Sequence, residues 1–389
     1  LVLANRLGAA CTAPDRLLLL RWGEGVGQRT LLTWIGIQSR EVSVTLGKYS
    51  VGAGDRFGRQ GVAQVAAFQA LRDAGVEVDI VWNKSHREHQ IIGTTPADQR
   101  AAADAAVAAS GWTGRYFVDA DHITMSSVDA FADYCDFFTL DVTAFIGRPP
   151  DAEALDAFEA RHASLVGRIG VPGIAEPLMV TSQLLHRVGL RYLAAVTEAG
   201  RTYRHIRSIK GDTPIVVEVS MDETDQPQTP AELLIILAAI ADAGIPIATI
   251  APKFSGRFNK GIDYAGDVAN FLAEFRADVC VASYAVDAFG LPVGLKLSVH
   301  TGSDKFSIYP GIGALIRELD AGLHLKTAGT TWLEELVGLA EAGGSGLELA
   351  KQIYRDAYHR YDELVAPYSD VIDIDQSALP FPDVVDAWT

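Results

Sequence analysis

Two aspartates and a histidine follow a hydrophobic run near residue 118, where buried charge is costly. The run GRYFV (residues 114–118) continues directly into Asp119, Asp121 and His122. Because side chains alternate along a strand, the two aspartates share one face and His122 takes the other, unless the backbone bends there. Carboxylates and an imidazole placed together suit acid–base chemistry or the binding of a cation. This segment is therefore a candidate functional site.

Other strand-like runs also contain residues that suit chemistry. Glu218 lies within the apolar segment VVEVS, where a buried carboxylate suits a general acid or base. His122, His300 and His324 lie at or near such runs, and imidazoles with carboxylate oxygens suit Zn, Mn, Ni or Co. The alternative is that each histidine is a hydrogen-bonded structural residue. His324 is the weakest of the three as a ligand, because it lies early in its run and fits a lower layer.

Charged residues in and after these runs are candidates to bind an anionic or hydroxylated ligand. The alternative for each is a salt bridge to a neighbouring charge. The candidates are Asp55, Arg56, Lys253, Arg257, Lys260, Asp263, Asp304, Lys305 and Lys326.

Eight strand-like runs alternate with helical patterns, and this order predicts parallel β–α–β units. Eight units close a (β/α)8 barrel, although an open doubly wound sheet has the same periodicity. We expect the α/β class with a TIM-type barrel, whose functional residues lie at the carboxyl ends of the strands. The runs cover residues 41–51, 77–83, 115–121, 137–143, 213–221, 246–254, 294–300 and 323–329.

The same order predicts a single barrel domain over residues 1–389, with its core at about 41–340. A helical insertion is expected after the fourth strand, at about 151–209. A C-terminal helix and an irregular tail are expected over 341–389.

The composition, with 49% hydrophobic and 21% charged residues, is that of an ordinary globular protein. The formal net charge of −16 disfavours a nucleic-acid partner and favours a small polar molecule. Cys11, Cys135 and Cys280 lie far apart, which favours reduced thiols in a cytoplasmic protein over a disulfide framework or a cysteine zinc site. No apolar stretch reaches the roughly 20 residues of a membrane span. No targeting signal can be read from a sequence that begins at Leu1, and a homo-oligomer stays open.

The segment GAGDRFG (residues 52–58) has the outline of a dinucleotide-binding turn between a strand and a helix. Its glycines fall at 52, 54 and 58, which departs from the GxGxxG spacing. Arg56 and Phe57 are also bulky where a pyrophosphate needs close approach. The spacing therefore disfavours a dinucleotide site.

Six segments together resemble the tagaturonate epimerase family of hexuronate catabolism. Members of that family interconvert tagaturonate and fructuronate, and some act on free ketohexoses as fructose/tagatose 4-epimerases. The segments run in the expected order over roughly residues 45–340. They are GAGDRFG (52–58), YFVDADHI (116–123), VEVSMDET (217–224), APKFSGRFNKGIDYAGD (251–267), KLSVHTGSDKFSIYP (296–310) and HLKTAGTTWLE (324–334).

The resemblance implies a metal-dependent TIM-type barrel with isomerase activity on a small sugar or sugar acid. The site residues that it implies by motif are His122 and His300 as metal ligands and Asp121 and Glu218 as the acid–base pair. The third ligand stays open; we expect His324, with Asp263 as the alternative.

The chemistry expected of such an enzyme is an aldol cleavage and re-addition. The two epimers differ one carbon beyond the position next to the ketone, so simple enolisation cannot invert that carbon. A divalent cation would act as a Lewis acid on the ketone, and two carboxylates would move the hydroxyl proton. Lys253, Arg257 and Lys305 would hold the substrate's carboxylate or hydroxyls. Transient oxidation by a tightly held NAD is the rival mechanism.

Two other functions stay open at the level of sequence. One is another metal-dependent barrel enzyme, an aldolase or a ketose–aldose isomerase with the same constellation. The other is a sugar-acid sensor or binding protein on a barrel scaffold without turnover.

Overall fold

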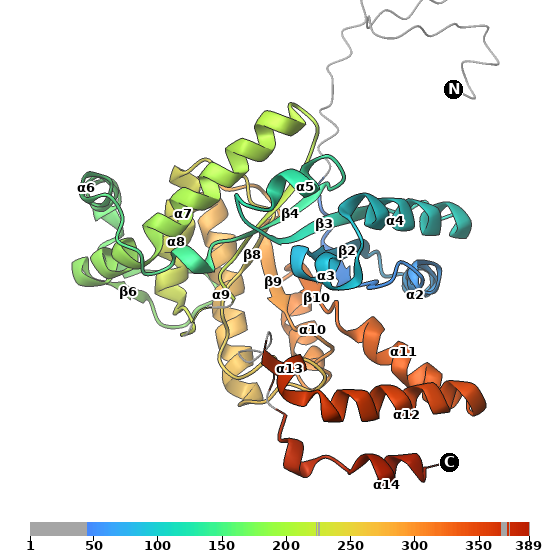
Figure 1. Ribbon diagram of the computed structural model, residues 1–389. Coiled ribbons are helices and arrows are strands. Elements are labelled where there is room, and N and C mark those ends of the chain that lie inside the picture. Colours follow the sequence, from blue (N-terminus) through green and yellow to red (C-terminus); the bar gives the residue numbers. More distant parts are fainter. Residues whose placement is uncertain (1–44, 223, 225, 367–371, 373, 389) are drawn as a thin grey trace, which may run out of the picture. The chain divides into compact units, whose positions relative to one another are not determined.

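Eight parallel strands close into a barrel, which confirms the (β/α)8 prediction (Figure 1). The computed structural model describes residues 45–388 apart from 223, 225, 367–371 and 373. Around the barrel the order is β1-β10-β9-β8-β7-β4-β3-β2. The barrel strands are β1 (Tyr49–Ala53), β2 (Asp79–Ser85), β3 (Tyr116–Ile123), β4 (Phe137–Asp141), β7 (Val216–Ser220), β8 (Thr249–Ala251), β9 (Lys296–His300) and β10 (Leu323–Lys326).

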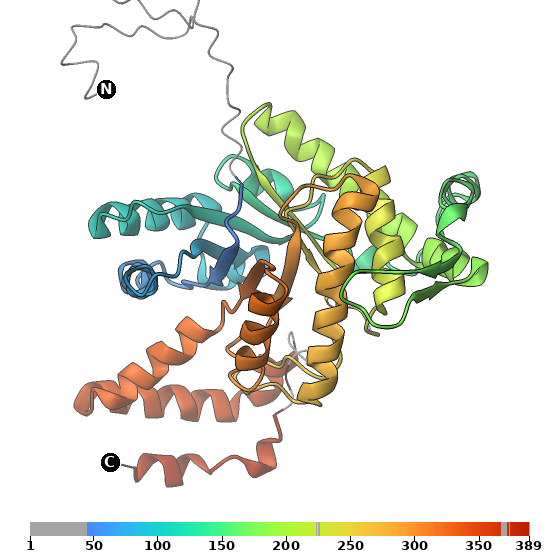
Figure 2. The same ribbon diagram turned by 180° about the vertical axis from the view of Figure 1, so that it is seen from behind.

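Helices surround the barrel, as views from both sides show (Figures 1 and 2). At the C-terminal end, α12 packs against both α11 and α14, and these helices lie together on one side of the barrel. The helices are α2 (Gly61–Asp73), α3 (His86–Ile92), α4 (Pro96–Ser110), α5 (Val128–Ala132), α6 (Ala152–Arg161), α7 (Ser182–Lys210), α8 (Pro230–Asp242), α9 (Val268–Phe289), α10 (Tyr309–Glu318), α11 (Thr330–Glu341), α12 (Gly344–His359), α13 (Tyr361–Val365) and α14 (Pro382–Asp386).

The helix α8 shows why the core between barrel and helices is continuous. Every residue from Leu233 to Ile240 is buried, because α7, α9 and the short strand β6 (Leu178–Val180) pack around it. A helix that is apolar on every face is expected only where neighbours cover it all round. Among the described residues, no helix is long and apolar enough to cross a membrane.

The insertion after β4 contains a hairpin as well as the expected helices. The helix α6 is followed by the antiparallel pair β5 (Gly167–Ile169) and β6, and only then by α7. Gly167, Gly170 and Pro172 interrupt any helical periodicity between α6 and α7, because glycine and proline are the poorest helix formers. The chain therefore leaves the helix and returns as an extended hairpin.

Two sequence predictions fall partly outside the described residues. Cys135 and Cys280 are buried free thiols, as expected, whereas Cys11 lies outside the described part of the chain. The expected first strand at 41–51 is observed from Tyr49, and residues 41–44 are not described. That residues 1–44 belong to the same domain as the barrel stays a prediction.

The inside of the barrel changes character along its axis. One end is filled by a small apolar cluster of Val81, Phe117, Phe137 and Val216. Because residues two apart on a strand face the same way, the next inward positions on β3 and β7 are Asp119 and Glu218. The upper half is therefore lined by buried polar side chains, which a barrel core of branched aliphatic residues would not contain.

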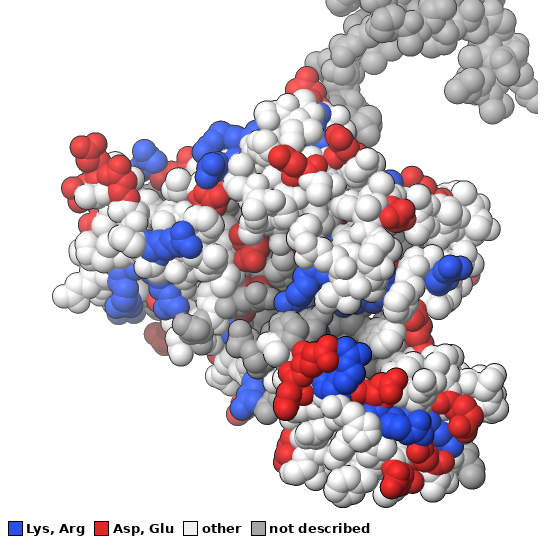
Figure 3. Space-filling view, viewed as in Figure 1, with Lys and Arg blue, Asp and Glu red and all other residues white. Residues whose placement is uncertain are grey.

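Acidic and basic side chains are interspersed on the outer surface. On the face shown in Figure 3, they alternate over α12 and α13 at the C-terminal end. This mixing agrees with a surface that carries many charges of both signs and a net negative total.

Candidate active site

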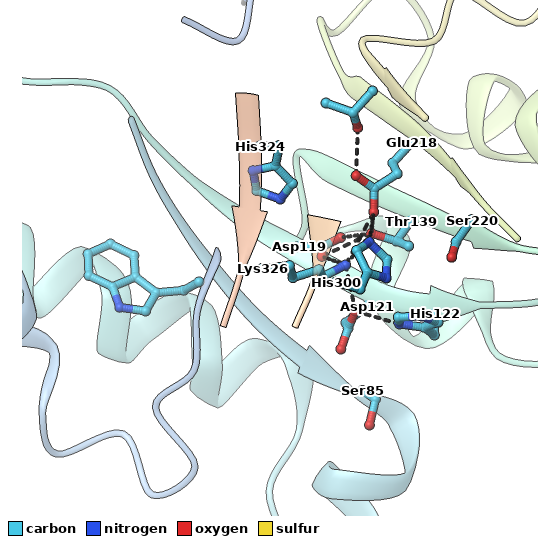
Figure 4. A network of polar contacts seen from close by, with 12 residues as sticks. Ser85, Asp119, Asp121, His122, Thr139, Glu218, Ser220, His300, His324 and Lys326 are labelled. Atoms are coloured by element: carbon cyan, nitrogen blue, oxygen red, sulfur yellow. Dashed lines mark hydrogen bonds and ion pairs between the residues drawn. The ribbon is translucent and has the colours of Figure 1, made fainter. Parts of the chain in front are cut away.

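Side chains from four barrel strands meet in the polar upper half of the barrel (Figure 4). β3 contributes Asp119 and Asp121, β7 contributes Glu218, β9 contributes His300 and β10 contributes Lys326. These positions are at or near the carboxyl ends of their strands, where barrel enzymes carry their functional residues. The expectation that the strand ends converge is therefore confirmed.

His122 reaches the same region because the backbone bends at the end of β3. Its φ is 52°, a value that residues other than glycine seldom adopt. The pairing of β3 with β4 shifts register between Ala120 and Ile123. Regular alternation puts His122 on the opposite face from Asp121, and this irregularity turns it back toward the interior. His122 was expected on the opposite face from Asp121 unless the backbone bends, and the backbone does bend there.

His122, Asp222 and His300 form a compact group at the mouth of the barrel. Their ligand atoms all lie within 4.8 Å of one another, and no other group of three such residues does so in the described part of the chain. The two imidazole rings are 5.2 Å apart between centroids. The Asp222 carboxylate accepts a hydrogen bond from His300 Nδ1 at 3.0 Å and lies 3.6 Å from His122 Nε2. Two imidazoles and a carboxylate at this spacing suit a divalent transition metal.

Each of the two imidazoles is also held by a second carboxylate on its other nitrogen. His122 Nδ1 donates to Asp121 Oδ1 at 2.7 Å, and His300 Nε2 donates to Glu218 Oε1 at 2.8 Å (Figure 4). Carboxylates that accept the second ring N–H fix the orientation and the tautomer of a metal-binding histidine. Asp121 and Glu218 therefore hold the two rings through the nitrogens that do not face Asp222.

Lys326 contacts both of these carboxylates. Its ammonium lies 2.7 Å from Asp121 Oδ1, 2.9 Å from Asp119 Oδ2 and 3.5 Å from Glu218 Oε1. It also donates to Thr139 Oγ1 at 2.7 Å. Burial opposes a charged amine, but the three carboxylates outweigh it and raise the pKa of Lys326 well above its usual range. Burial raises the pKa of Asp119 to about 7, against the pull of Lys326.

The carboxylates also control the protonation of the two imidazoles. Burial disfavours the imidazolium form, but Asp222 and Glu218 outweigh it and raise the pKa of His300 to about 9. Burial likewise opposes a charge on His122, and Asp121 and Asp222 raise its pKa well above the usual range. The group therefore attracts positive charge strongly.

A second set of charges lies at the rim. Arg56 forms an ion pair with Glu88 at the start of α3, and Lys84 Nζ donates to the Arg56 carbonyl oxygen at 2.9 Å. Burial lowers the pKa of Lys260, and the charges of Glu88, Arg56 and Asp121 also act on its amine. A Cβ on Gly302 would lie 3.2 Å from Lys260 Cγ, so the stem of Lys260 lies against the loop that follows β9.

The two expected third ligands lie outside the compact group. His324 is fully buried one layer lower, where its Nδ1 bonds to Ser50 Oγ at 2.9 Å, and burial lowers its pKa to about 3. Asp263 is exposed and caps a loop by accepting from the backbone N–H groups of Tyr264 and Ser307. Asp222 instead stands beside the two imidazoles.

Several other expected ligand-binding residues make local contacts. Lys305 is fully buried and donates to the carbonyl and hydroxyl oxygens of Ser303 at 2.8 and 3.0 Å. Asp304 accepts from Tyr309 Oη at 2.7 Å. Asp55 caps the chain before α2, accepting from the N–H groups of residues 59 and 60. These contacts shape the loops of the rim.

The remaining two lie in the loop after β8. Arg257 is exposed, and its backbone pairs with Ala265 in an isolated bridge. Lys253 is half-buried, and its backbone N–H donates to Gln228 Oε1 at 2.8 Å. Neither residue belongs to the compact group at the mouth.

The glycines of GAGDRFG serve packing. A Cβ on Gly54 would lie 2.3 Å from the carbonyl oxygen of Ala328, and one on Gly61, just beyond the motif, would lie 2.6 Å from Ala106 Cβ. These close approaches bring the loop after β1 against the loop after β10 and against α4. The motif therefore anchors the rim that carries Arg56.

Sequence reasoning did not assign Asp222 a role, although a signal for it exists. Asp222 follows the apolar strand β7 after a single residue, in the place where barrel enzymes carry ligands. Its neighbour Glu223, which shares that signal, lies outside the described residues. Thr139, one of the two hydroxyl partners of Glu218, carries no signal beyond its place on an inward face.

Fold and site together define a (β/α)8-barrel protein with an imidazole–carboxylate group at the carboxyl ends of its strands. The family model described as tagaturonate epimerase matches residues 37–386. The chain belongs to the tagaturonate epimerase family, as the six resembling segments indicate.

Known relatives agree with this membership. The chain is 29% identical over 325 residues to the tagaturonate/fructuronate epimerase of Thermotoga maritima, which covers 81% of this chain and 63% of that protein. A glycerol complex of the fructuronate-tagaturonate epimerase of Cohnella laeviribosi matches with a TM-score of 0.71 and 28% identity, over 88% of this chain and 69% of that one. The native structure of the same enzyme gives 0.70 and 25%, over 88% and 71%. The chain thus spans less than two thirds of the length of its Thermotoga relative.

Proposed function

We propose that this protein is a metal-dependent epimerase that interconverts tagaturonate and fructuronate. Its family membership and the activities named for its relatives support the reaction. The observation that carries the proposal is the approach of His122, Asp222 and His300 to within 4.8 Å at the carboxyl ends of the barrel strands. We assign these three residues as the metal ligands.

The residues fit a divalent cation in two independent ways. His122 Nε2 is buried without a hydrogen-bond partner among the described residues, and it faces Asp222 Oδ1 at 3.6 Å. A buried nitrogen of this kind costs free energy unless something binds it. Each ring also donates its other N–H to a carboxylate, Asp121 or Glu218, which is the usual arrangement around metal-binding histidines. Nitrogen and oxygen donors suit Zn, Mn, Ni or Co.

The reaction requires cleavage of a carbon–carbon bond. The carbon that differs between the epimers is one bond beyond the carbon next to the ketone, so removal of a proton beside the ketone cannot invert it. The substrate is a β-hydroxy ketone. When its hydroxyl proton is removed, the bond between the two carbons breaks, and its electron pair moves to the ketone half. The other half becomes an aldehyde, which turns over before the bond re-forms and the proton returns.

Asp121 is the group of this chain best placed to move that proton. Its contacts with His122 and Lys326 both go to Oδ1 in the described part of the chain, and we propose that Oδ2 takes up the substrate's proton. Its side chain is 11% exposed, whereas Glu218 is fully buried with both oxygens engaged. A bound divalent cation supplies Lewis acidity to the ketone oxygen. We therefore assign proton transfer to Asp121 and a supporting position to Glu218.

The far end of the substrate carries a carboxylate, and the rim offers cations for it. Arg56 forms an ion pair with Glu88, and the stem of Lys260 lies against Gly302 in the loop after β9. Guanidinium and ammonium groups bind carboxylates through charge-assisted hydrogen bonds. We propose that these two residues bind the carboxylate or the neighbouring hydroxyls.

Metal removal and substrate comparison test the function directly. We expect a chelator to abolish conversion of tagaturonate and fructuronate, and Mn, Co, Ni or Zn to restore it. Tagatose and fructose, assayed in parallel, report whether the carboxylate is required. Full activity after exhaustive chelation, or stoichiometric NAD in the purified protein, would overturn the proposal.

Solvent deuterium separates this reaction from its nearest alternative. A ketose–aldose isomerase exchanges the C–H next to the carbonyl with solvent, and the aldol route does not need to. We therefore expect product without deuterium at that carbon when the reaction runs in D2O. Stoichiometric incorporation would favour the isomerase, and sugar binding without any turnover would favour a sensor.

A further inference from the structure

Lys326 occupies the centre of the polar network without reaching the surface. Its side chain is 4% exposed. An ammonium has three N–H donors, and four oxygens lie around it, those of Asp119, Asp121, Thr139 and Glu218 (Figure 4). No donor is left over for a substrate at the mouth. The expected role of Lys326 in substrate binding therefore does not fit its surroundings.

Two of its partners, Asp121 and Glu218, each contact one of the two imidazoles. Asp121 Oδ1 contacts both Lys326 at 2.7 Å and the Nδ1–H of His122 at 2.7 Å. Glu218 Oε1 contacts Lys326 at 3.5 Å and the Nε2–H of His300 at 2.8 Å. One ammonium is thus the common neighbour of the carboxylates behind both rings. These rings come from β3 and β9, which are not adjacent in the barrel.

The backbone of β1 is adapted to this lysine. A Cβ on Gly52 would lie 2.9 Å from Lys326 Cγ and 3.2 Å from its Cα. Such distances are shorter than normal carbon–carbon contacts of about 3.5–4.0 Å. The absence of a side chain at Gly52 therefore gives the stem of Lys326 its path up the inside of the barrel.

We propose that Lys326 is a positioning residue for the metal site. It holds Asp121 and Glu218 where each accepts one imidazole N–H, and it thereby directs His122 Nε2 and His300 Nδ1 toward Asp222. The proposal rests on the metal-dependent function above. It extends that function from the three ligands to the buried cation that aligns two of them.

A purely electrostatic effect of Lys326 predicts the opposite change in metal affinity, so the direction of that change tests the proposal. Removing a positive charge beside a cation site favours binding of the cation by Coulomb's law. Removing a group that aligns the carboxylates behind metal-binding histidines weakens binding, by about 10–100-fold in known sites. A positioning role therefore predicts weaker binding on removal of Lys326, and a purely electrostatic role predicts tighter binding.

The experiment titrates the metal-free full-length protein with Co²⁺ and follows its visible absorption spectrum, without substrate. We expect Lys326→Met to weaken Co²⁺ binding by about 10–100-fold and to alter the spectrum, which reports ligand geometry. The matched control is Lys296→Met, which removes a buried lysine from the same barrel at its other end. We expect that variant to bind Co²⁺ within about twofold of the unaltered protein, because distant substitutions seldom couple.

A second variant guards against a failure of Lys326→Met to fold. Gly52→Ala adds one methyl group against the lysine stem and removes no polar atom. We expect it to weaken Co²⁺ binding in the same direction and by less. Unchanged or tighter binding in either folded variant overturns the positioning role.

A double-mutant cycle gives a readout that a merely stabilising role does not produce. If Lys326 acts through Asp121, the effects of Lys326→Met and Asp121→Asn on Co²⁺ affinity are not additive. Additive effects overturn the proposed link. Failure of the unaltered protein to bind Co²⁺ overturns the metal-dependent function as well, whereas binding that is indifferent to Lys326 overturns the positioning role alone.

Discussion

Two buried lysines on adjacent strands, Lys326 of β10 and Lys296 of β9, occupy opposite ends of the barrel and different surroundings. Each is 4% exposed. The amine of Lys326 lies among three carboxylates at the mouth. The amine of Lys296 donates to the backbone carbonyl oxygens of Gly47 and Lys48 at the floor. Burial is equal, so the difference between them comes from their partners.

Their pKa values move in opposite directions for this reason. Burial lowers the pKa of Lys296 to about 8, because its partners are neutral carbonyls and Arg115 partly cancels the attraction of Asp79. The same burial acts on Lys326, but the carboxylates raise its pKa well above the usual range. The floor thus uses a lysine to satisfy backbone carbonyls. The mouth uses one to hold a cluster of negative charge in place.

The largest effect is expected from Asp222→Asn at the mouth. Loss of a metal ligand removes Lewis acidity worth several kcal/mol, so we expect kcat/KM to fall by about a thousandfold or more. The amount of bound metal should fall with it. Asp79→Asn is the matched change at the floor, where the carboxylate pairs with Arg115. It should lower stability and leave kcat/KM of the folded enzyme nearly unchanged. Equal losses of kcat/KM in the two variants would mean that the mouth and the floor of the barrel do not differ in their importance for catalysis.

A large but more selective effect is expected from Asp121→Asn. General acid–base groups contribute about 10²–10⁴-fold to rate, so we expect kcat to fall by that amount while KM changes little. The measurement must be made at saturating metal, because Asp121 also holds His122. Full recovery of kcat at high metal concentration would reduce Asp121 to a positioning residue like Glu218.

The parallel α/β class and the convergence of the strand ends could be predicted from sequence, because both follow from the order of elements. Closure into a barrel was the favoured one of two arrangements that this order allows. The position of His122 could be predicted only with the condition that the backbone bends, since one irregular residue decides which face its side chain takes. The low position of His324 was readable from its place early in a strand. These successes depend on local pattern along one segment.

The places of Asp222 and Lys326 could not be predicted, because both depend on contacts between distant segments. Asp222 accepts a hydrogen bond from His300, which lies 78 residues later in the chain. Lys326 and His324 share one face of β10, and only the carboxylates of β3 and β7 distinguish their roles. Likewise, the ion pair between Arg56 and Glu88 joins the loop after β1 to α3, two segments whose contact the sequence pattern does not show.

A moderate, pH-dependent effect on stability is expected from His324, a fully buried histidine that is bonded to the neutral hydroxyl of Ser50. Burial lowers its pKa to about 3 in the folded protein, against about 6.5 when unfolded. The unfolded state therefore binds a proton first as pH falls. The stabilising contribution is complete above pH 6.5 and is lost progressively below it, by about 2 kcal/mol between pH 6.5 and 5.

Chemical denaturation of the unaltered protein and of His324→Gln at pH 6.5 and 5 measures this contribution. We expect the variant to lose less stability over that interval, whatever its stability at neutral pH. Identical losses would mean that His324 is already protonated or solvated in the folded barrel, contrary to its contact with Ser50.

The smallest effect is expected from Lys296→Met. The sign of its change in stability tests whether Lys296 differs from Lys326. The folded pKa of Lys296 is about 8, below the unfolded value of 10.5. Below pH 8 the folded protein carries the whole cost of burying this charge, and between pH 8 and 10.5 only the unfolded state still binds the proton, so the cost is relieved. We therefore expect Lys296→Met to stabilise the protein at pH 7 by about 1 kcal/mol, after loss of its hydrogen bonds to carbonyls. The charge cost that the variant removes falls by about 3 kcal/mol between pH 7 and pH 10.5, so the gain should become a net loss at pH 10.5, as denaturation at the two pH values can measure. A loss of stability at pH 7 would mean that the floor depends on its ammonium as the mouth does, and the contrast between them would fail.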